Sequence, residues 1–469
     1  MSNIAKNIES SGNALEVVNP FDQKAIGSVA LTDADTVDKY LEIAHGLFRD
    51  RKHWLPAYRR IDILKKTARI MGVRFEELAF QIANEGGKPL IDARVEVTRA
   101  IDGVELAAKE LSHLTGTEIP MDLTEAGAGR MAFTSREPIG VVVAVSAFNH
   151  PLNLIVHQVA PAVAVGCPVL VKPADDTPLS CKAFVDILHE AGLPDEWCRF
   201  VACDIPTAEK MVTDPRVAFF TFIGSAKVGW MLRSKLAPGT RCALEHGGAA
   251  PVIVDSSADI NAMIPSLLKG GFYHSGQVCV SVQRIFAPKK QAEDIAQLLA
   301  DGASKLVVGN AIEEVTECGP LIRPREVDRV AQWIDEVKNT VITGGEKLNE
   351  TTYAPTVLLN PPIDAKVSTM EIFGPAVCVY GYDDMNAAIE QANALPFAFQ
   401  ASVFTKNLDT AMNAIQNLDA TAVMVNDHTA FRTDWMPFAG RRQSGYNTGG
   451  IGYTMHDMTQ DKMAVIKLQ

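Results

Sequence analysis

Gly140-Val-Val-Val-Ala-Val145 opens a region, residues 140–247, in which short apolar runs alternate with segments of helical periodicity. The apolar runs read as strands, at Val141–Val145, Val169–Val171, Phe200–Val201, Ala218–Phe222 and Thr240–Leu244. Strands that alternate with helices form βαβ units, whose strands lie parallel in one sheet. Such sheets bind nucleotides at the carboxyl ends of their strands. The sequence therefore predicts an α/β protein with a parallel, nucleotide-binding sheet.

Helical patterns precede this region, and a second α/β series follows it. Apolar residues three and four apart predict helices over residues 35–48, 60–71 and 91–114. Residues 115–136 then change to turn residues and short alternating segments, which predict an exposed hairpin of the kind that pairs with a partner chain. Strands and helices alternate again from Pro251 to about Ser444. Because 469 residues exceed what one core usually supports, two or more domains are expected.

The composition argues against several classes of protein. Hydrophobic residues make up 47% and charged residues 21%, as in ordinary globular proteins, and the net charge of −12 argues against nucleic acid as the main partner. The longest apolar run, Val159–Val171, is broken by two prolines and a glycine and is too short to span a bilayer, so no membrane partner is expected. Residues 1–9 lack the apolar core of a signal peptide, which predicts a cytosolic location.

Eight cysteines are scattered along the chain without a Cys-x-x-Cys pair or a nearby histidine at metal-ligand spacing. Reduced thiols are the simplest account, and no metal site is expected. One of them, Cys279, lies in Gly276-Gln-Val-Cys-Val280, between a predicted helix end at residues 270–275 and a predicted strand at 280–286. A side chain at such a junction can face a cleft, where a thiolate of lowered pKa is a strong nucleophile. The alternative is a buried structural cysteine.

Two further segments accompany this cysteine, Ala243-Leu-Glu-His-Gly-Gly248 and Ala147-Phe-Asn-His-Pro151. In order and separation, the three segments resemble the Gly-Gln-x-Cys, Glu-Leu-Gly-Gly and Trp-Asn-x-Pro signatures of the aldehyde dehydrogenase superfamily. Glu371-Ile-Phe-Gly-Pro375 and Pro437-Phe-Ala-Gly-Arg-Arg-Gln-Ser-Gly445 are similar to two later segments of that family. The resemblance therefore extends over nearly the whole chain, from about residue 18 to the tail.

The resemblance implies a fold in three parts. It implies a Rossmann-type dinucleotide-binding domain over residues 1–120 and 139–247, and an α/β catalytic domain over residues 248–444. Residues 121–138 and 445–469 would form a protruding β oligomerisation element. A homo-oligomer, either a dimer or a tetramer, is therefore expected.

The resemblance also implies the chemistry. Cys279 would attack an aldehyde to give a thiohemiacetal and then a thioester, and Asn149 would donate to the oxyanion beside the Cys279 backbone N–H; one such donor is typically worth about 3 kcal/mol. Glu245 would activate the water that hydrolyses the thioester. Taken singly, Asn149 is also compatible with a turn residue and Glu245 with a surface acid at a strand end. His246 departs from the pattern, because the family usually has leucine there.

The cofactor site is predicted in Phe222-Ile-Gly-Ser-Ala-Lys-Val-Gly229, where a strand runs into a helix. Gly224, Ser225 and Gly229 would bring backbone N–H groups to a phosphate. Trp230 stands where a P-loop needs lysine, which disfavours hydrolysis of a nucleoside triphosphate.

Four more residues are assigned to the cofactor. Lys172 at a strand end can bind ribose hydroxyls or phosphate. Asp175 can accept from a 2′-hydroxyl while repelling a 2′-phosphate, so NAD is favoured and NADP is the alternative. By the resemblance, Glu371 binds the nicotinamide ribose and Phe373 packs near the nicotinamide; a Gly-Pro turn beside a core aromatic is the other interpretation.

The substrate is expected to be small and polar. Residues 153–161 resemble the branch of the family that acts on lactaldehyde, succinic semialdehyde and sulfo- or phosphono-aldehydes. Arg99 and Arg432 are candidates to bind an anionic group and His150 to add a hydrogen bond, unless the arginines are paired with Glu96 or Asp434.

The expected activity is therefore NAD-dependent oxidation of a small polar aldehyde, anionic or neutral, to the free acid. A CoA-acylating enzyme is the alternative. Glu245 argues against it, because transfer of the acyl group to CoA needs no hydrolytic base.

Overall fold

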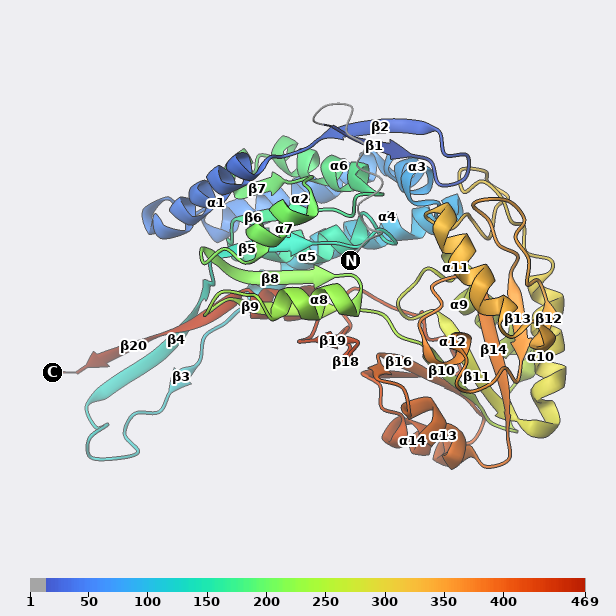
Figure 1. Cartoon of the computed structure of the whole chain (residues 1–469). Coiled ribbons are helices and arrows are strands. Elements are labelled where there is room, and N and C mark those ends of the chain that lie inside the picture. Colours follow the sequence, from blue (N-terminus) through green and yellow to red (C-terminus); the bar gives the residue numbers. More distant parts are fainter. Residues whose placement is uncertain (1–13, 469) are drawn as a thin grey trace.

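The computed structural model describes residues 14–468 (Figure 1). Residues 1–9, on which the expectation of no signal peptide rests, lie outside the described residues, as does Gln469. Figure 1 shows two α/β units side by side and a long β arm that extends away from the first unit. This architecture confirms the α/β fold predicted from the sequence.

The first unit is built on a six-stranded sheet in the order β19-β9-β8-β5-β6-β7. Five strands are parallel and β19 is antiparallel to β9. The strands are β5 (Val141–Val145), β6 (Val169–Lys172), β7 (Cys198–Phe200), β8 (Val217–Ile223), β9 (Arg241–Glu245) and β19 (Gly445–Tyr446). The predicted strands therefore exist, within two residues at each end.

Helices cover both faces of this sheet, because successive strand residues point to opposite sides. Val142 and Ala144 of β5 pack into one core, whereas Val141 and Val143 pack into the other. The first core is covered by α2 (Ala57–Val73), α3 (Phe75–Gly86), α4 (Leu90–Glu110), α5 (Asn153–Val165), α6 (Pro178–Glu190) and α15 (Ile451–Asp457). The second is covered by α1 (Ala34–Arg49), α7 (Ile205–Val212) and α8 (Ala226–Arg233).

A hairpin of β1 (Ala14–Val18) and β2 (Ala25–Ala30) packs near α6. Helix α3 is a separate helix that the sequence did not indicate. Only Arg74 separates it from the end of α2, and the helix predicted over residues 60–71 corresponds to α2 alone.

The second unit is built on a seven-stranded sheet in the order β12-β13-β14-β11-β10-β16-β17, parallel except for β12. Its strands are β10 (Ala250–Val254), β11 (Val282–Pro288), β12 (Val341–Thr343), β13 (Thr356–Leu359), β14 (Ala376–Tyr382), β16 (Gln400–Phe404) and β17 (Ala422–Val425). One core lies under α9 (Ile260–Phe272) and α10 (Lys289–Ala303). The other lies under α11 (Pro324–Asp335), α12 (Lys366–Thr369), α13 (Met385–Asn393) and α14 (Leu408–Asn417). Short strands β15 (Phe397–Ala398) and β18 (Arg441–Arg442) pair beside it.

The arm is a three-stranded antiparallel sheet in the order β20-β4-β3. β4 (Arg130–Pro138) pairs along its whole length with β20 (Thr459–Lys467), and β3 (Glu118–Ile119) pairs with its other edge. The sequence predicted an oligomerisation element of residues 121–138 and 445–469; within the second of these segments, β19 pairs with β9 and α15 packs on α4 and α5. The arm therefore comprises residues 118–138 and 459–467, and residues 445–458 lie with the first unit.

Within residues 14–468, no helix is both long enough and apolar enough to cross a membrane.

Candidate active site

A cavity of about 590 Å³ opens between segments of both units. Residues that follow β5, β8 and β9 form one wall, and residues around Cys279, Arg323, Glu371 and Arg432 form the other. The three predicted catalytic residues, Cys279, Glu245 and Asn149, all line it. Of the other predicted site residues, Gly224, Ser225, Glu371, Phe373, Arg99, His150 and Arg432 also line it, whereas Lys172, Asp175 and Gly229 do not.

Cys279 lies between the end of α9 and the start of β11, as the sequence predicted. A tight turn at residues 273–276 separates it from α9; Gly276 has a positive φ of 70°, and a Cβ there would clash with the Gly374 carbonyl. Buried Gln277 fixes the next position, because its Nε2 donates to the Pro320 carbonyl (3.2 Å) and its Oε1 accepts from the Ile322 N–H (2.9 Å). The turn therefore presents Cys279 to the cavity on a rigid support.

The thiol of Cys279 is protonated in this environment. All eight cysteines are free, and seven are buried whereas Cys279 is partly exposed. Burial, and then the nearby carboxylates of Glu245 and Glu371, raise the pKa of Cys279 well above its ordinary value. A nucleophilic thiolate was expected here with a lowered pKa, whereas the surroundings of Cys279 raise that pKa. Attack therefore requires a neighbouring base to accept the thiol proton.

Asn149 lies in the turn between β5 and α5 and is 4% exposed. Its Nδ2 donates to the backbone carbonyl of Gln277 at 3.0 Å, which ties it to the segment that carries Cys279. A carboxamide nitrogen has two protons, so one remains for an oxygen atom bound beside the cysteine.

Glu245 is the last residue of β9, and its carbonyl accepts from the Gly224 N–H at 3.0 Å. Burial raises the pKa of its carboxyl to about 7, although nearby Arg432 acts to lower it. Oε1 has no hydrogen-bond partner among the described residues and lies 4.0 Å from Arg432 NH1. A carboxylate with this proton affinity can accept and release a proton near neutral pH.

Two glycines of the site are required by their neighbours. A Cβ at Gly247 would clash with the carboxylate of Glu371, whose Oε1 accepts from the Gly248 N–H at 3.2 Å. A Cβ at Gly229 would clash with the ring of His246. His246 is 2% exposed, and its Nδ1 lies 2.7 Å from the Gly224 carbonyl; because a carbonyl only accepts, Nδ1 carries the proton. Gly229, on α8, therefore leaves room for the ring of His246, which contacts the Gly224 carbonyl.

Several unsatisfied groups of the cavity fit a dinucleotide. No side chain caps the first turn of α8, where Gly224 and Ser225 line the cavity, so its N–H groups can receive a phosphate. Ser146 Oγ is buried in the wall without a hydrogen-bond partner among the described residues. Burial raises the pKa of Glu371 to about 8. Beside the cavity, Lys172 donates to Asp175 at 2.7 Å.

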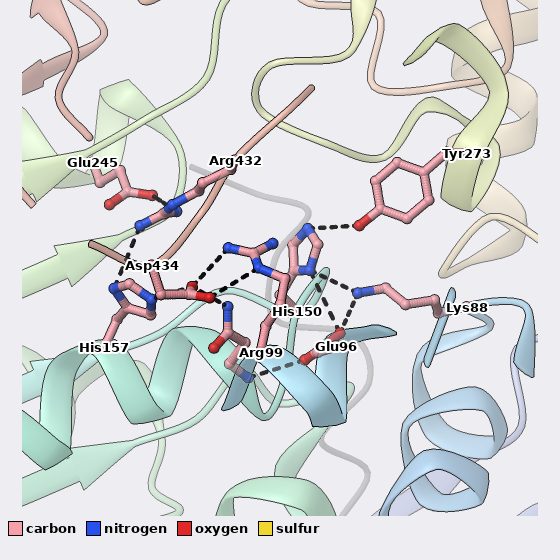
Figure 2. A network of polar contacts seen from close by, with 10 residues as sticks. Lys88, Glu96, Arg99, His150, His157, Glu245, Tyr273, Arg432 and Asp434 are labelled. Carbon is pink, nitrogen blue, oxygen red and sulfur yellow. Dashed lines mark hydrogen bonds and ion pairs between the residues drawn. The ribbon is translucent and has the colours of Figure 1, made fainter. Parts of the chain in front are cut away.

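Asp434 joins the two predicted anion-binding arginines (Figure 2). Arg99 donates to it twice, from Nε at 3.2 Å and NH2 at 2.8 Å, and His157 Nε2 lies 2.8 Å from Oδ1. Arg432 NH2 lies 3.4 Å from His157 Nδ1. Because arginine only donates, Nδ1 accepts and Nε2 donates to Asp434, and burial, followed by the charge of Arg432, lowers the pKa of His157 to about 4. Arg99 is therefore paired with an acid, as one alternative predicted.

Arg432 has only a long ion pair, with its NH1 4.0 Å from Glu245 Oε1. Its guanidinium lies over the Phe438 ring at 3.5 Å from the centroid, and its Nε is buried without a hydrogen-bond partner among the described residues. His157 is a site residue that the sequence did not indicate, and Asp434 was expected only as an acid that pairs with an arginine. Helix α5, which carries His157, is buried on every side, so no exposed polar position marked it.

The same buried network continues to Lys88, Glu96 and His150, because Asn153 Nδ2 donates to Asp434 at 3.2 Å and the Asn153 N–H donates to Glu96 (Figure 2). Lys88 and Glu96 form a fully buried ion pair, and Lys88 Nζ lies 2.8 Å from His150 Nδ1. Oε1 of Glu96 accepts from the backbone N–H groups of Leu152 and Asn153, at 2.9 and 3.0 Å. The pair therefore anchors the segment that carries Asn149 and His150. No group of three or more His, Cys, Asp or Glu side chains in the described part of the chain is placed to bind a metal.

Comparison with known proteins connects this geometry to one family. The model of the aldehyde dehydrogenase family matches residues 7–464. A 3-sulfolactaldehyde dehydrogenase of Priestia aryabhattai is 34% identical over 463 residues, which are 98% of this chain and 96% of the relative.

Two solved structures have the same fold. Aldehyde dehydrogenase 21 from Physcomitrella patens, in complex with the reaction product succinate, superposes with a TM-score of 0.93 at 34% identity, over 98% of this chain and 96% of its own. Glyceraldehyde-3-phosphate dehydrogenase GapN from Methanocaldococcus jannaschii, complexed with NADP, superposes with a TM-score of 0.92 at 30% identity, over 98% of this chain and 100% of its own.

Proposed function

Since this chain belongs to the aldehyde dehydrogenase family, we propose that it oxidises a small, polar, anionic aldehyde to the free acid with NAD(P) as the oxidant. The observation that carries the anionic part is Arg432, a buried cation in the cavity wall without a carboxylate that neutralises it fully. A bound anion could accept from the unpaired Nε and give this guanidinium a closer carboxylate or sulfonate partner than Glu245.

Cys279 and Asn149 are suited to the first step. Cys279 Sγ forms a bond to the aldehyde carbon as its proton passes to a base, for which Glu245 is the nearby carboxylate with a pKa near 7. The developing oxyanion receives hydrogen bonds from the free Asn149 Nδ2 proton and from the Cys279 backbone N–H. The chemistry that a bound NAD(P) would supply at this site is that of a hydride acceptor.

Glu245 is suited to the second step, the hydrolysis of the thioester. Once the proton accepted from Cys279 has passed to solvent, the Glu245 carboxylate removes a proton from water, which attacks the acyl carbon. The departing Cys279 sulfur takes up that proton from Glu245 as the free acid is released. The position of this base in the cavity wall supports hydrolysis over transfer of the acyl group to CoA, since transfer to CoA needs no activated water.

The first turn of α8, Ser146 and Glu371 would bind the cofactor, and Phe373 would pack beside it. Asp175 supports a preference for NAD, because a carboxylate next to the ribose disfavours a 2′-phosphate. GapN from Methanocaldococcus jannaschii was solved with NADP. The preference of this chain for NAD over NADP is therefore a property to measure.

Two relatives support the anionic substrate. One is named for 3-sulfolactaldehyde, and another was solved with succinate. A sulfonate or a carboxylate would meet Arg432 and the outer face of Arg99, which both line the cavity. A neutral small aldehyde such as lactaldehyde remains the second candidate, because Arg99 is already paired with Asp434.

A homo-oligomer is part of the proposal. Apolar side chains of β4 and β20 are exposed on the arm, namely Met131, Phe133, Met463, Val465 and Ile466. A protruding sheet with exposed apolar residues is stabilised when a second copy covers it.

The test is oxidation of a matched panel of aldehydes, followed by the absorbance of the reduced cofactor. The panel contains propionaldehyde, lactaldehyde, succinic semialdehyde, sulfoacetaldehyde and phosphonoacetaldehyde. A preference of at least about tenfold in kcat/KM for an anionic member is expected, the size of one charge-assisted hydrogen bond. Equal rates would remove the anion site, and no oxidation of any member would contradict the activity.

A further inference from the structure

Tyr273 and His150 form a hydrogen-bonded pair in the cavity wall that none of the steps above uses. The Tyr273 hydroxyl lies 3.3 Å from His150 Nε2, and both residues line the cavity (Figure 2). Tyr273 also packs against the same small apolar cluster as Cys279, around Val278 and Phe438. The hydroxyl therefore belongs to the wall next to the nucleophile.

The buried ion pair determines which nitrogen of His150 carries a proton. Burial would raise the pKa of Glu96, but its ion pair with Lys88 holds that pKa well below its ordinary value; burial also lowers the pKa of Lys88, and the charge of Glu96 acts against that change. His150 Nδ1 lies closer to Lys88 Nζ, at 2.8 Å, than to Glu96 Oε2, at 3.5 Å, so we assign Lys88 as the ammonium partner of Nδ1. An ammonium only donates, and therefore His150 Nδ1 accepts from Lys88. Burial, and then the charge of Lys88, lower the pKa of His150 to about 4. Neutral His150 thus carries its single proton on Nε2.

This assignment leaves the hydroxyl proton of Tyr273 free. His150 Nε2–H donates to the tyrosine oxygen, and burial raises the pKa of Tyr273 well above its ordinary value, so the phenol keeps its own proton. Within residues 14–468, no other hydrogen-bond partner of this hydroxyl is recorded. Donation from Lys88 through His150 also polarises the hydroxyl and strengthens it as a donor. The wall therefore offers one directed O–H donor to a bound molecule.

Tyr273 lines the same cavity as the two groups that the substrate must reach. Cys279, Arg99 and Arg432 all line this cavity, and Tyr273 packs in the small apolar cluster that contains Cys279. A short aldehyde would place its carbonyl at Cys279 and its anionic group at Arg432 and Arg99. The carbon atom between these two groups would then lie beside Tyr273. An oxygen on that carbon would accept a hydrogen bond from the free hydroxyl proton of Tyr273.

We infer that Tyr273, oriented by His150, forms a subsite for a hydroxyl group on the carbon next to the aldehyde, so that 2-hydroxy aldehydes are the preferred substrates. The inference rests on the proposed function, because it places the aldehyde at Cys279. A site built to hydrogen-bond a substrate hydroxyl rejects the analogue that lacks it, since its buried polar group is left unpaired. Because the donor approaches from one side, it also distinguishes the two enantiomers.

The experiment compares lactaldehyde with propionaldehyde, which differ by one hydroxyl, and uses D- and L-lactaldehyde separately. We expect kcat/KM to be about 10- to 100-fold higher for one lactaldehyde enantiomer than for propionaldehyde. Tyr273→Phe should lose most of that preference and of the enantiomer preference, because kcat/KM for the favoured lactaldehyde enantiomer falls more than kcat/KM for propionaldehyde. Tyr58→Phe is the matched control, because Tyr58 is 70% exposed on α2 and does not line the cavity.

A second measurement needs no turnover. 3-Sulfolactate and 3-sulfopropionate are compared as inhibitors, competitive with the aldehyde, of the wild type and of His150→Gln, whose amide can still donate to the tyrosine. Tighter inhibition by 3-sulfolactate, the hydroxylated acid, is expected. His150→Gln should keep part of this difference between the two inhibition constants.

Equal inhibition by both acids, or an enantiomer preference that Tyr273→Phe leaves unchanged, would overturn the subsite. A hydroxyl preference without a preference for anions would contradict only the proposed anion site. Absence of oxidation of every aldehyde, combined with equal inhibition, would contradict both.

Discussion

Glu245 Oε1 lies 4.0 Å from Arg432 NH1 in the wall of the cavity. The general base and the cation proposed to bind the substrate are therefore electrostatic neighbours. Burial raises the pKa of Glu245 to about 7, and Arg432 is the group that acts against that rise. An anion bound to Arg432 would offset part of its charge, and Glu245 would then bind its proton more tightly.

Glu245→Gln is expected to remove the pH dependence of the wild type around pH 7. Because the folded-state pKa is about 7, the ionised base and the rate of thioester hydrolysis should increase about tenfold per pH unit below that value and level off above it. The glutamine variant should hydrolyse slowly at every pH and show a burst of reduced cofactor. An unchanged steady-state rate would count against the role of Glu245.

The same variant should also change the pH dependence of stability. Because the pKa of this carboxyl is higher in the folded than in the unfolded protein, protonation favours the folded state. This contribution to stability is complete below the unfolded pKa of about 4.3 and is lost as the pH rises through the folded pKa of about 7. Glu245→Gln should therefore have a higher melting temperature relative to the wild type at pH 8 than at pH 5. A difference independent of pH would mean that Glu245 is not buried as described.

Cys279→Ala is expected to abolish oxidation while binding of NAD, measured by calorimetry, stays within about twofold. The thiol is the atom that bonds to the aldehyde carbon, and no other thiol lines the cavity. Cys203→Ala is the control, because Cys203 is a buried cysteine of the second core of the first unit. Residual turnover by Cys279→Ala above that of an unrelated protein would refute the nucleophile.

Arg432→Gln should increase KM for anionic aldehydes by at least about tenfold and change that for propionaldehyde by less than about threefold, since only an anion loses a charged hydrogen bond. Asp434→Asn should act in the same direction, because Asp434 orients Arg99 directly and Arg432 through His157. Arg59→Gln, on the exposed side of α2, provides the control. Equal effects on neutral and anionic aldehydes would indicate a structural role only.

Asp175→Ala should lower KM for NADP by about tenfold and leave kcat with NAD nearly unchanged. The substitution removes a carboxylate that repels a 2′-phosphate and releases Lys172, to which it is paired at 2.7 Å. Asp186→Ala, in an exposed pair on α6, is the control. If KM for NADP did not change, Asp175 would lie away from the ribose.

Gly229→Ala should lower stability by about 1–3 kcal/mol, because the added methyl group must displace the buried ring of His246. His246→Ala vacates that space, so the double variant should recover most of the loss that Gly229→Ala causes. Urea unfolding of both single variants and the double variant measures this coupling. Additive effects would show that the two side chains do not meet.

Short-range patterns explain why part of the site could be predicted from sequence. Cys279, Glu245 and Asn149 each lie at the end of a strand or in a turn, within a segment whose own residues form the local geometry. All three line one cavity, where the predicted parallel sheet should bind its ligand. Their assigned roles stay predictions until the variants above are measured.

Long-range contacts explain what could not be predicted. His157 and Asp434 are 277 positions apart, and neither local sequence indicates the other. Arg99 and Asp434 are 335 positions apart, and the choice between a free and a paired arginine depends on packing of α4 against a distant loop. The raised pKa of Cys279 is likewise a property of the folded cavity, because burial and two carboxylates from separate segments cause it.

The pairing of β4 with β20 has a consequence for how the protein is made. During synthesis β4 leaves the ribosome long before residues 459–467 exist, and β19, at the edge of the six-stranded sheet, is also made late. Until then β4 has only the two-residue β3 as a neighbour, and its other edge presents unpaired N–H and C=O groups. A nascent chain that stalls before residue 459 would therefore be prone to edge-to-edge aggregation, even though its nucleophile, oxyanion donor and general base have all been translated.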